Sequence, residues 1–321
     1  MNKNIEWIKK QWVAFGPMVA ISSTLNKVYK YGPHTNNVAY AINKWKHKCI
    51  EKALCKKYGY VIERYSAKAD ALQSQPSKYG NTIWTIWWQG EENAPEAMKM
   101  CYQSMRKFSS GHEVIVISES NYSEYITLPD FVLEKVKDGK INFIHLADII
   151  RMHLMYYHGG LWLDATLFLL EEMPNEIFEY SYFTGKLPRT KMACVSEGRW
   201  NGTFFGGHPG NPFFEFMINF YYEYWKHEEQ VIDYFLIDYM TDIAYQKIPS
   251  FTKQLDAVPV NNEKIFQMNN YLNSAFDSDI YNEIVSTTGF HKLQRRNSYR
   301  MTTDDGELTF YGYLVKIIYG D

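Results

Sequence analysis

The chain has 321 residues, enough to bury a substantial core in one large domain or two small ones. Hydrophobic residues at 46% and charged residues at 22% are typical of a folded protein, and no apolar stretch approaches the ~20 residues that cross a bilayer. The formal net charge of −2 is unevenly distributed, because residues 1–60 hold eleven lysines and two glutamates and the rest is acidic.

Residues 1–72 are predicted to form a helical basic segment, with Trp7, Trp12, Phe15 and Trp45 among the lysines. Two interpretations stay open: contact with an anionic membrane surface, or a basic helical pair packed on an acidic domain. Nucleic acid is not an expected partner, since the chain has no basic-aromatic sheet motif and no zinc-finger spacing.

A polar stretch around Pro76 predicts a linker, which divides the chain into residues 1–72 and a second domain at 80–321. The dense β-branched and aromatic run at 82–88 then predicts a strand that ends at Gly90.

The following segments alternate between helix and strand patterns. A helix is expected to begin at Pro95, a buried strand at 114–117, one or two helical turns at 131–136 and a strand at 141–144. This alternation is typical of βαβ units, so it predicts an α/β fold with a mostly parallel sheet flanked by helices.

The segment 145–168 has the most informative pattern. A predicted helix ends at Gly159-Gly160, and a hydrophobic strand then brings Asp164 to its carboxyl end, where α/β sheets bind ligands. An Asp-x-Asp pair there would hold Mg²⁺ or Mn²⁺ on a diphosphate, but the triplet is Asp164-Ala165-Thr166. One carboxylate and a hydroxyl leave metal dependence open.

Asp148 and Arg151 share one face of the predicted helix and have apolar neighbours, so we expect a buried pair. Arginine suits bidentate contact with phosphate or sugar oxygens, and aspartate accepts hydrogen bonds from vicinal hydroxyls. The alternative is a surface ion pair worth a few tenths of a kcal/mol.

Beyond Asp164 the chain predicts a strand at Tyr182, a glycine-rich loop at 201–212, an aromatic helix at 212–225 and a further helix at 230–245.

His291 and Lys292 could complete a diphosphate site through an imidazole on a metal and an ammonium on the phosphates, or be a surface pair. Trp87 or Trp88 could stack on a base or be core. Phosphate-loop nucleotidases, serine hydrolases and zincins lack their motifs here. The four cysteines lack zinc spacing, and with no secretory signal they are expected to be free thiols in the cytoplasm.

Together these residues resemble the capsular polysaccharide synthesis glycosyltransferases, in Ala147-Asp-Ile-Ile-Arg151 and Tyr156-Tyr-His-Gly-Gly-Leu-Trp-Leu-Asp-Ala-Thr166. The pattern is more distantly similar to that of the fungal initiating α-mannosyltransferases and the glucosylating clostridial toxins, Ser-Asp-x-x-Arg…Gly-Gly-x-Tyr-x-Asp-x-Asp. The likeness covers roughly residues 80–295.

The resemblance implies a Rossmann-like GT-A fold with a helical N-terminal extension. It implies transfer of a hexose or N-acetylhexosamine, with retention, from a nucleotide sugar (a UDP-sugar by preference) to a lipid-linked or growing surface polysaccharide. A protein hydroxyl is the alternative acceptor, and a non-catalytic nucleotide-sugar-binding protein the alternative class. Asp233 and Asp238 are candidates for the acceptor side. The expected location is the cytoplasm, at the inner face of the cell membrane.

The resemblance also implies roles within the donor site. Trp87 would stack on the base beside Gly90, Asp148 would bind donor hydroxyls, and Arg151 would touch the sugar or diphosphate. Asp148 and Arg151, with Asp164, are the residues expected to act in catalysis.

The remaining expected roles concern the diphosphate. Asp164 would hold the cation or the ribose, and Thr166 stands where wider relatives have the second aspartate. His291 and Lys292 would close over the diphosphate, with Asp164 and His291 as ligands of a Mn²⁺ or Mg²⁺ ion.

Overall fold

The computed structural model describes residues 3–30, 37–66 and 77–320, and its centre is a five-stranded sheet in the order β2-β1-β3-β6-β5. β1 pairs in parallel with β2 and β3, whereas β6 is antiparallel to both β3 and β5. Four strands therefore run in one direction and β6 runs in the other. The strands span Ile83–Ile86 (β1), Val114–Ile117 (β2), Gly160–Leu163 (β3), Tyr182–Thr184 (β5) and Phe204–Gly207 (β6).

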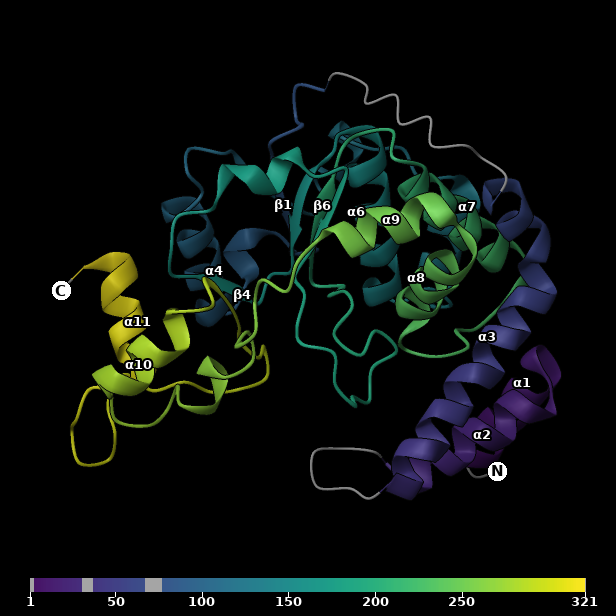
Figure 1. The fold of residues 1–321 in the computed structure, drawn as a ribbon, viewed down its shortest axis with the longest axis horizontal. Helices are drawn as coiled ribbons and strands as arrows, with labels where there is room; N and C mark the ends of the chain where they lie inside the picture. Colours follow the sequence, from purple (N-terminus) through teal and green to yellow (C-terminus); the bar gives the residue numbers. More distant parts are fainter. Residues whose placement is uncertain (1–2, 31–36, 67–76, 321) are drawn as a thin grey trace.

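A second, two-stranded antiparallel sheet joins β4 (Leu167–Leu169) to β7 (Phe290–Lys292). Figure 1 shows the N-terminal helices at one end of the molecule and α10 and α11 at the other, with the main sheet between them. The helices are α1 (Lys3–Phe15), α2 (Pro17–Val28), α3 (Asn37–Ser66), α4 (Glu96–Lys107), α5 (Asp130–Lys137), α6 (Phe143–Tyr157), α7 (Pro212–His227), α8 (Leu236–Lys247), α9 (Pro249–Ala257), α10 (Ser278–Val285) and α11 (Phe310–Tyr319).

Alternation along the strands divides the core into two parts. Trp84 and Trp162 face a cluster shared with α3, α6, α7 and α8, whereas Ile83 and Leu161 face a cluster shared with α4, α11, β4 and β7. Successive side chains of a strand point to opposite faces, so each buried strand needs helices or a second sheet on both sides. The predicted α/β class with flanking helices is confirmed.

The predicted helix, double glycine and strand are all present. α6 ends at Tyr157, Gly159 and Gly160 have φ of +70° and +92°, and β3 begins at once. A Cβ at Gly160 would lie 2.3 Å from the carbonyl oxygen of Thr82, so only glycine lets β3 start flush against β1.

Three predicted elements are wrong or misplaced. The strand expected at 141–144 does not form, because the Asn142 side chain accepts hydrogen bonds from the N–H groups of Ile144 and His145 and so caps α6. The glycine-rich loop expected at 201–212 contains strand β6. The helix expected at 230–245 begins only at Leu236.

The N-terminal helices pack on the second half of the chain through ion pairs. Lys46 Nζ lies 3.0 Å from Asp233 Oδ2, and Lys57 Nζ lies 2.5 Å from Glu228 Oε1. Basic α3 thus rests on acidic neighbours, as one of the two interpretations expected. The predicted linker, residues 71–81, lies partly outside the described residues, which resume at residue 77, so the division into 1–72 and 80–321 stays a prediction.

All four cysteines are free thiols, as expected. Among the helices in the described ranges, none combines the length and the apolar character needed to cross a bilayer.

Where α3 meets α8, Glu51 lies against Asp242. Burial first, and then the hydrogen bond and negative charge of Asp242, raise the pKa of Glu51 to about 8, against the opposing effects of a hydrogen bond from Gln246 and the charge of Lys44. Between the ordinary pKa of 4.5 and this value the folded protein holds a proton that the unfolded chain has lost. The free energy of unfolding is therefore expected to fall as the pH rises through that window.

Glu51→Gln tests this expectation, because the amide keeps hydrogen-bonding capacity without the titration. Urea unfolding at several pH values should show less loss of stability toward pH ~8 in this variant than in the wild type. Glu63→Gln, an exposed position on the same helix, is the control and should match the wild type. Equal pH dependence in Glu51→Gln and the wild type would contradict the expectation.

Candidate functional site

Asp164 lies immediately after β3, at the edge where the carboxyl ends of β2, β1 and β3 meet. Its Oδ1 accepts hydrogen bonds from Lys292 Nζ at 2.9 Å, Thr166 Oγ1 at 2.7 Å and the Thr166 N–H at 3.1 Å. Lys292 comes from β7, which pairs with β4 directly after this turn. The structure thus joins two predicted residues 128 positions apart.

Opposing influences act on the Asp164 carboxyl. Burial alone raises its pKa, but the charge of Lys292 and the hydrogen bonds from Thr166 and Lys292 outweigh burial and hold the pKa well below its usual range. The side chain remains 33% exposed, so one face of a permanent carboxylate is open to a ligand.

Asp148 and Arg151 form the buried pair that the helix pattern predicted, with side chains 2% and 10% exposed. Arg151 Nη2 donates to Asp148 Oδ1, and His145 Nδ1 lies 3.3 Å from Asp148 Oδ2. The guanidinium also stands 5.3 Å from the ring centroid of Trp162 on β3. The alternative of an exposed surface pair is therefore wrong.

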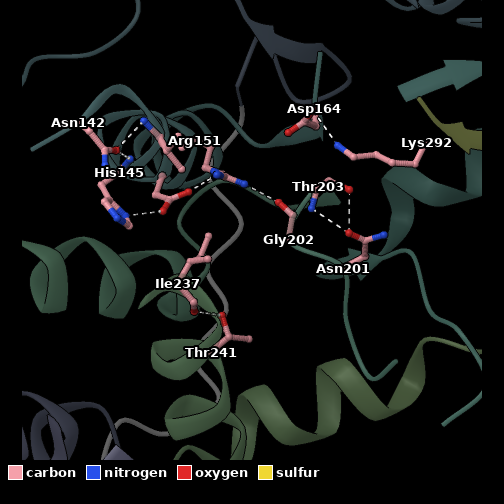
Figure 2. A network of polar contacts seen from close by, with 12 residues as sticks. Asn142, His145, Arg151, Asp164, Asn201, Gly202, Thr203, Ile237, Thr241 and Lys292 are labelled. Carbon is pink, nitrogen blue, oxygen red and sulfur yellow. Dashed lines mark hydrogen bonds and ion pairs between the residues drawn. The ribbon is translucent and has the colours of Figure 1, made fainter. Parts of the chain in front are cut away.

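The loop before β6 links the two charged pairs. Arg151 Nη1 donates to the carbonyl oxygen of Gly202, and the N–H of Asp164 donates to the carbonyl oxygen of Thr203 at 2.8 Å. Asn201 Oδ1 holds this turn by accepting from Thr203 N and Oγ1. Figure 2 shows Arg151 and His145 on one side, Asp164 and Lys292 on the other, and Gly202 and Thr203 between them.

Asp238 is a further predicted residue whose carboxyl is affected by the charges of this network. Asp238, on the first turn of α8, accepts a hydrogen bond from the Trp200 indole at 2.8 Å. Burial raises the pKa of Asp238 to about 6; the Trp200 hydrogen bond lowers it, while the charge of Asp148 adds to the rise. Asp238 had been a candidate for the acceptor side, a role that stays a prediction.

Tyr234 was not singled out from the sequence. Its side chain is 59% exposed, and after partial burial the negative charges of Asp148 and Asp164 raise the pKa of its hydroxyl. The negative charges of both carboxylates therefore act on one exposed tyrosine. In the sequence Tyr234 is marked only by its neighbour Asp233, and a tyrosine next to an aspartate is too common to indicate a site residue.

The expected nucleotide-binding residues lie at the adjoining strand ends. A cleft of about 650 Å³, lined by Trp88 and Gly90, runs along the edge strand β2. Trp87 instead packs toward the second core cluster, with the Arg295 guanidinium 5.9 Å from its ring centroid. Contact of Trp87 and Gly90 with a base stays a prediction.

Two further predicted residues, His291 and Asp233, make contacts within the protein itself. His291 is fully buried, so it is no surface residue, and burial lowers the pKa of its ring to about 4. It alternates along β7 with Lys292, and only the Lys292 side chain contacts Asp164. Asp233 precedes α8 and pairs with Lys46.

These residues do not make a good site for a divalent cation. Hard cations need several oxygen ligands, yet Asp164 Oδ1 already accepts from three donors and an ammonium group lies 2.9 Å away. The parts of the chain that the structure describes hold no group of three or more His, Cys, Asp or Glu side chains able to bind a metal. The expected Mn²⁺ or Mg²⁺ ion stays a prediction.

The fold and the site define the class: an α/β protein with a mostly parallel sheet and an Asp164–Lys292 pair just after β3. Comparison with known families narrows this class: the chain belongs to the capsular polysaccharide synthesis protein family, whose model matches residues 33–314. That match confirms the resemblance.

Two curated fungal proteins are also similar. The O-glycosyltransferase braB of Annulohypoxylon truncatum is 24% identical over 169 residues, 47% of this chain and 39% of that protein. The O-glycosyltransferase PaGT of Phomopsis amygdali is 26% identical over 128 residues, 34% of this chain and 32% of that protein. The chain thus spans less than half the length of these relatives.

Proposed function

We propose that this protein is a retaining GT-A glycosyltransferase that moves a hexose or N-acetylhexosamine from a nucleotide sugar, preferably a UDP-sugar. The proposed acceptor is a hydroxyl of a lipid-linked or growing surface polysaccharide, and the proposed location is the cytoplasm at the inner face of the cell membrane. Family membership supports the polysaccharide acceptor, and the relatives' name, O-glycosyltransferase, supports transfer to oxygen.

One observation carries the proposal. The Asp148–Arg151 pair and the Asp164–Lys292 pair are joined by the turn at Gly202 and lie at the carboxyl edge of the parallel strands. A nucleotide sugar offers hydroxyls that carboxylates accept from, and phosphates that cations bind. The site presents both kinds of group within one hydrogen-bonded network.

The reaction needs positioning and charge stabilisation more than a nucleophile. In our proposal Asp148 and Arg151 orient the sugar, and the Lys292 ammonium stabilises the charge on the departing diphosphate. The bond from the anomeric carbon to the diphosphate oxygen breaks, and the bond to the acceptor oxygen forms on the same face. The acceptor proton passes to the departing diphosphate, so no protein base is consumed.

The cleft beside β2 would take the nucleoside. Its volume of about 650 Å³ falls within the range of small-molecule sites, and its lining includes Trp88 and Gly90, which follow β1, the strand that pairs with β3. In our proposal the acceptor hydroxyl is bound beside Tyr234 and Asp238, whose pKa values are raised in part by the charge of Asp148.

Product analysis tests this function against its alternatives. Purified protein is incubated with UDP-, GDP-, CMP- and dTDP-sugars, with and without Mn²⁺ or Mg²⁺, and with lipid-linked glycan or protein acceptors. Anomer-retained glycolipid supports the proposal, whereas glycosylated protein without glycolipid would replace its acceptor. If wild type and Asp164→Ala bind donor equally and neither turns it over, the protein is a non-catalytic binder.

Asp238 makes the proposed reaction depend on pH. Its carboxylate would accept a hydrogen bond from the acceptor hydroxyl, so kcat/KM for transfer should fall as the pH drops through about 6. Asp238→Asn should lower kcat/KM at pH ~8 by about a hundredfold and abolish this acidic limb. Rates measured from pH ~5 to ~9 give both results.

Trp200→Phe is the matched test of the same pH dependence. It removes the indole hydrogen bond that lowers the pKa of Asp238, so the acidic limb should move to higher pH. An acidic limb that persists unchanged in Asp238→Asn would assign the titration to another group.

A further inference from the structure

The helical hairpin of α1 and α2 exposes more apolar surface than its length explains. Seven of the seventeen large apolar side chains that are exposed in the described part of the chain belong to residues 3–30. They are Ile5, Trp12, Val13, Met18, Ile21, Val28 and Tyr29. Single exposed apolar residues are common, but a cluster on one small element marks an interaction surface.

Three of these side chains gather at the turn of the hairpin. Trp12 and Val13 precede the turn at Gly16 and are 50% and 86% exposed, and Met18 follows the turn at 53%. The opposite face of the hairpin is anchored, since Phe15 and Val19 belong to the core. The turn therefore presents its apolar side chains on a fixed support.

The charge of the same hairpin favours one kind of partner. Residues 3–30 contain five lysines and one glutamate, and Lys9 and Lys10 are exposed beside Trp12 on α1. Lys10 pairs with Glu6 at 3.2 Å within α1, whereas Lys46 and Lys57 on α3 pair with carboxylates of the second half of the chain. The hairpin therefore carries a net positive charge beside its exposed apolar side chains.

We infer that the α1–α2 hairpin docks onto an anionic lipid surface. In this arrangement Trp12, Val13 and Met18 enter the boundary between headgroups and acyl chains, while Lys9 and Lys10 contact lipid phosphates. A helix that lies in the interface needs an apolar face and a basic border, and no membrane-spanning length. This docking is independent of the proposed reaction, since it uses none of the site residues.

Vesicle sedimentation of the full chain tests the inference without donor or acceptor. The protein should pellet with vesicles in which about a third of the lipid is phosphatidylglycerol, and little with pure phosphatidylcholine. High salt should weaken the binding because it screens the lysines. A failure of sugar transfer would leave this result unaffected.

Two variants locate the contact on the hairpin. Trp12→Ser with Val13→Ser, and separately Lys9→Gln with Lys10→Gln, should each weaken binding to the anionic vesicles about tenfold or more. Val260→Ser with Phe266→Ser changes two similarly exposed apolar residues elsewhere and is the matched control. Circular dichroism checks that each variant is folded. We expect all of them to fold, because the substituted side chains are exposed.

Two outcomes would overturn the inference. One is wild-type protein that does not bind the anionic vesicles, or hairpin variants that bind as well as the wild type. The other is wild-type protein that self-associates without binding vesicles and becomes monomeric in Trp12→Ser with Val13→Ser, because the apolar face would then join two copies of the chain.

Discussion

Asp164→Asn is expected to lower kcat/KM for sugar transfer by about a hundredfold to a thousandfold, the cost of removing one charge-stabilising group from a reaction site. Asn keeps the size of the side chain but not its charge. The Lys292 ammonium, now 2.9 Å from Asp164 Oδ1, would lose the partner that orients it toward the diphosphate. Initial rates of donor turnover and transfer measure the effect.

Lys292→Met should reduce kcat/KM to a similar extent, because the ammonium that stabilises the negative charge of the departing diphosphate is lost with the side chain. The double variant Asp164→Asn with Lys292→Met should be little worse than either single variant. Residues that act as one unit give effects that do not add, and the double-mutant cycle measures this coupling directly.

Asp304→Asn provides the control for both variants. Asp304 forms an exposed pair with Arg300 at 2.6 Å, outside the site network, so its removal should leave kcat/KM unchanged. Full activity in Asp164→Asn would remove this carboxylate from the mechanism. Fully additive losses in the double variant would show that the two residues act separately.

Asp148→Leu is expected to lower the free energy of unfolding by about 3–5 kcal/mol, because it leaves a buried guanidinium without its partner. The side chains of Asp148 and Arg151 are 2% and 10% exposed, so water cannot replace the lost contact. Arg151→Met should be similarly costly, since it strands a buried carboxylate. Urea unfolding with a linear extrapolation measures both losses.

The double variant separates the structural role of this pair from its proposed role in donor binding. Asp148→Leu with Arg151→Met removes both charges, and a buried ion pair replaced by apolar residues costs little stability or none. Stability should therefore recover most of the way, whereas donor turnover should remain abolished. A double variant that regained both stability and turnover would show that the pair serves folding alone.

Arg151→Lys is the conservative companion of this test. It keeps a positive charge, but an ammonium cannot reproduce the planar contacts that Arg151 makes with Asp148 and the carbonyl oxygen of Gly202. We expect a folded protein with a raised KM for the donor.

Local chemistry explains which elements were predictable. The helix ending at Gly159-Gly160 and the strand before Asp164 follow from apolar spacing and from two glycines with positive φ. Pro95 and Pro212 likewise marked the starts of α4 and α7, because proline suits the first turn of a helix. Such signals act over a few residues and so can be recognised in one sequence.

The errors arose where distant contacts outweigh local preference. Phe204–Gly207 has the composition of a loop, yet it forms β6 because Gly206 and Gly207, without Cβ atoms, fit against the backbone of β3 and of Ser181. The run at 141–144 has strand composition, but the Asn142 cap commits it to α6.

The charged residues of the site and their local placement could be predicted from the residues alone: Asp148 and Arg151 on one face of a helix, and Asp164 at the end of a strand. The partners of these residues could not, because they come from distant parts of the chain. The Lys292 contact crosses 128 residues, and the turn at Gly202 joins the two pairs through backbone carbonyls, which any residue type can supply. Side-chain identity therefore marked the candidates, whereas long-range strand pairing assembled them into one site.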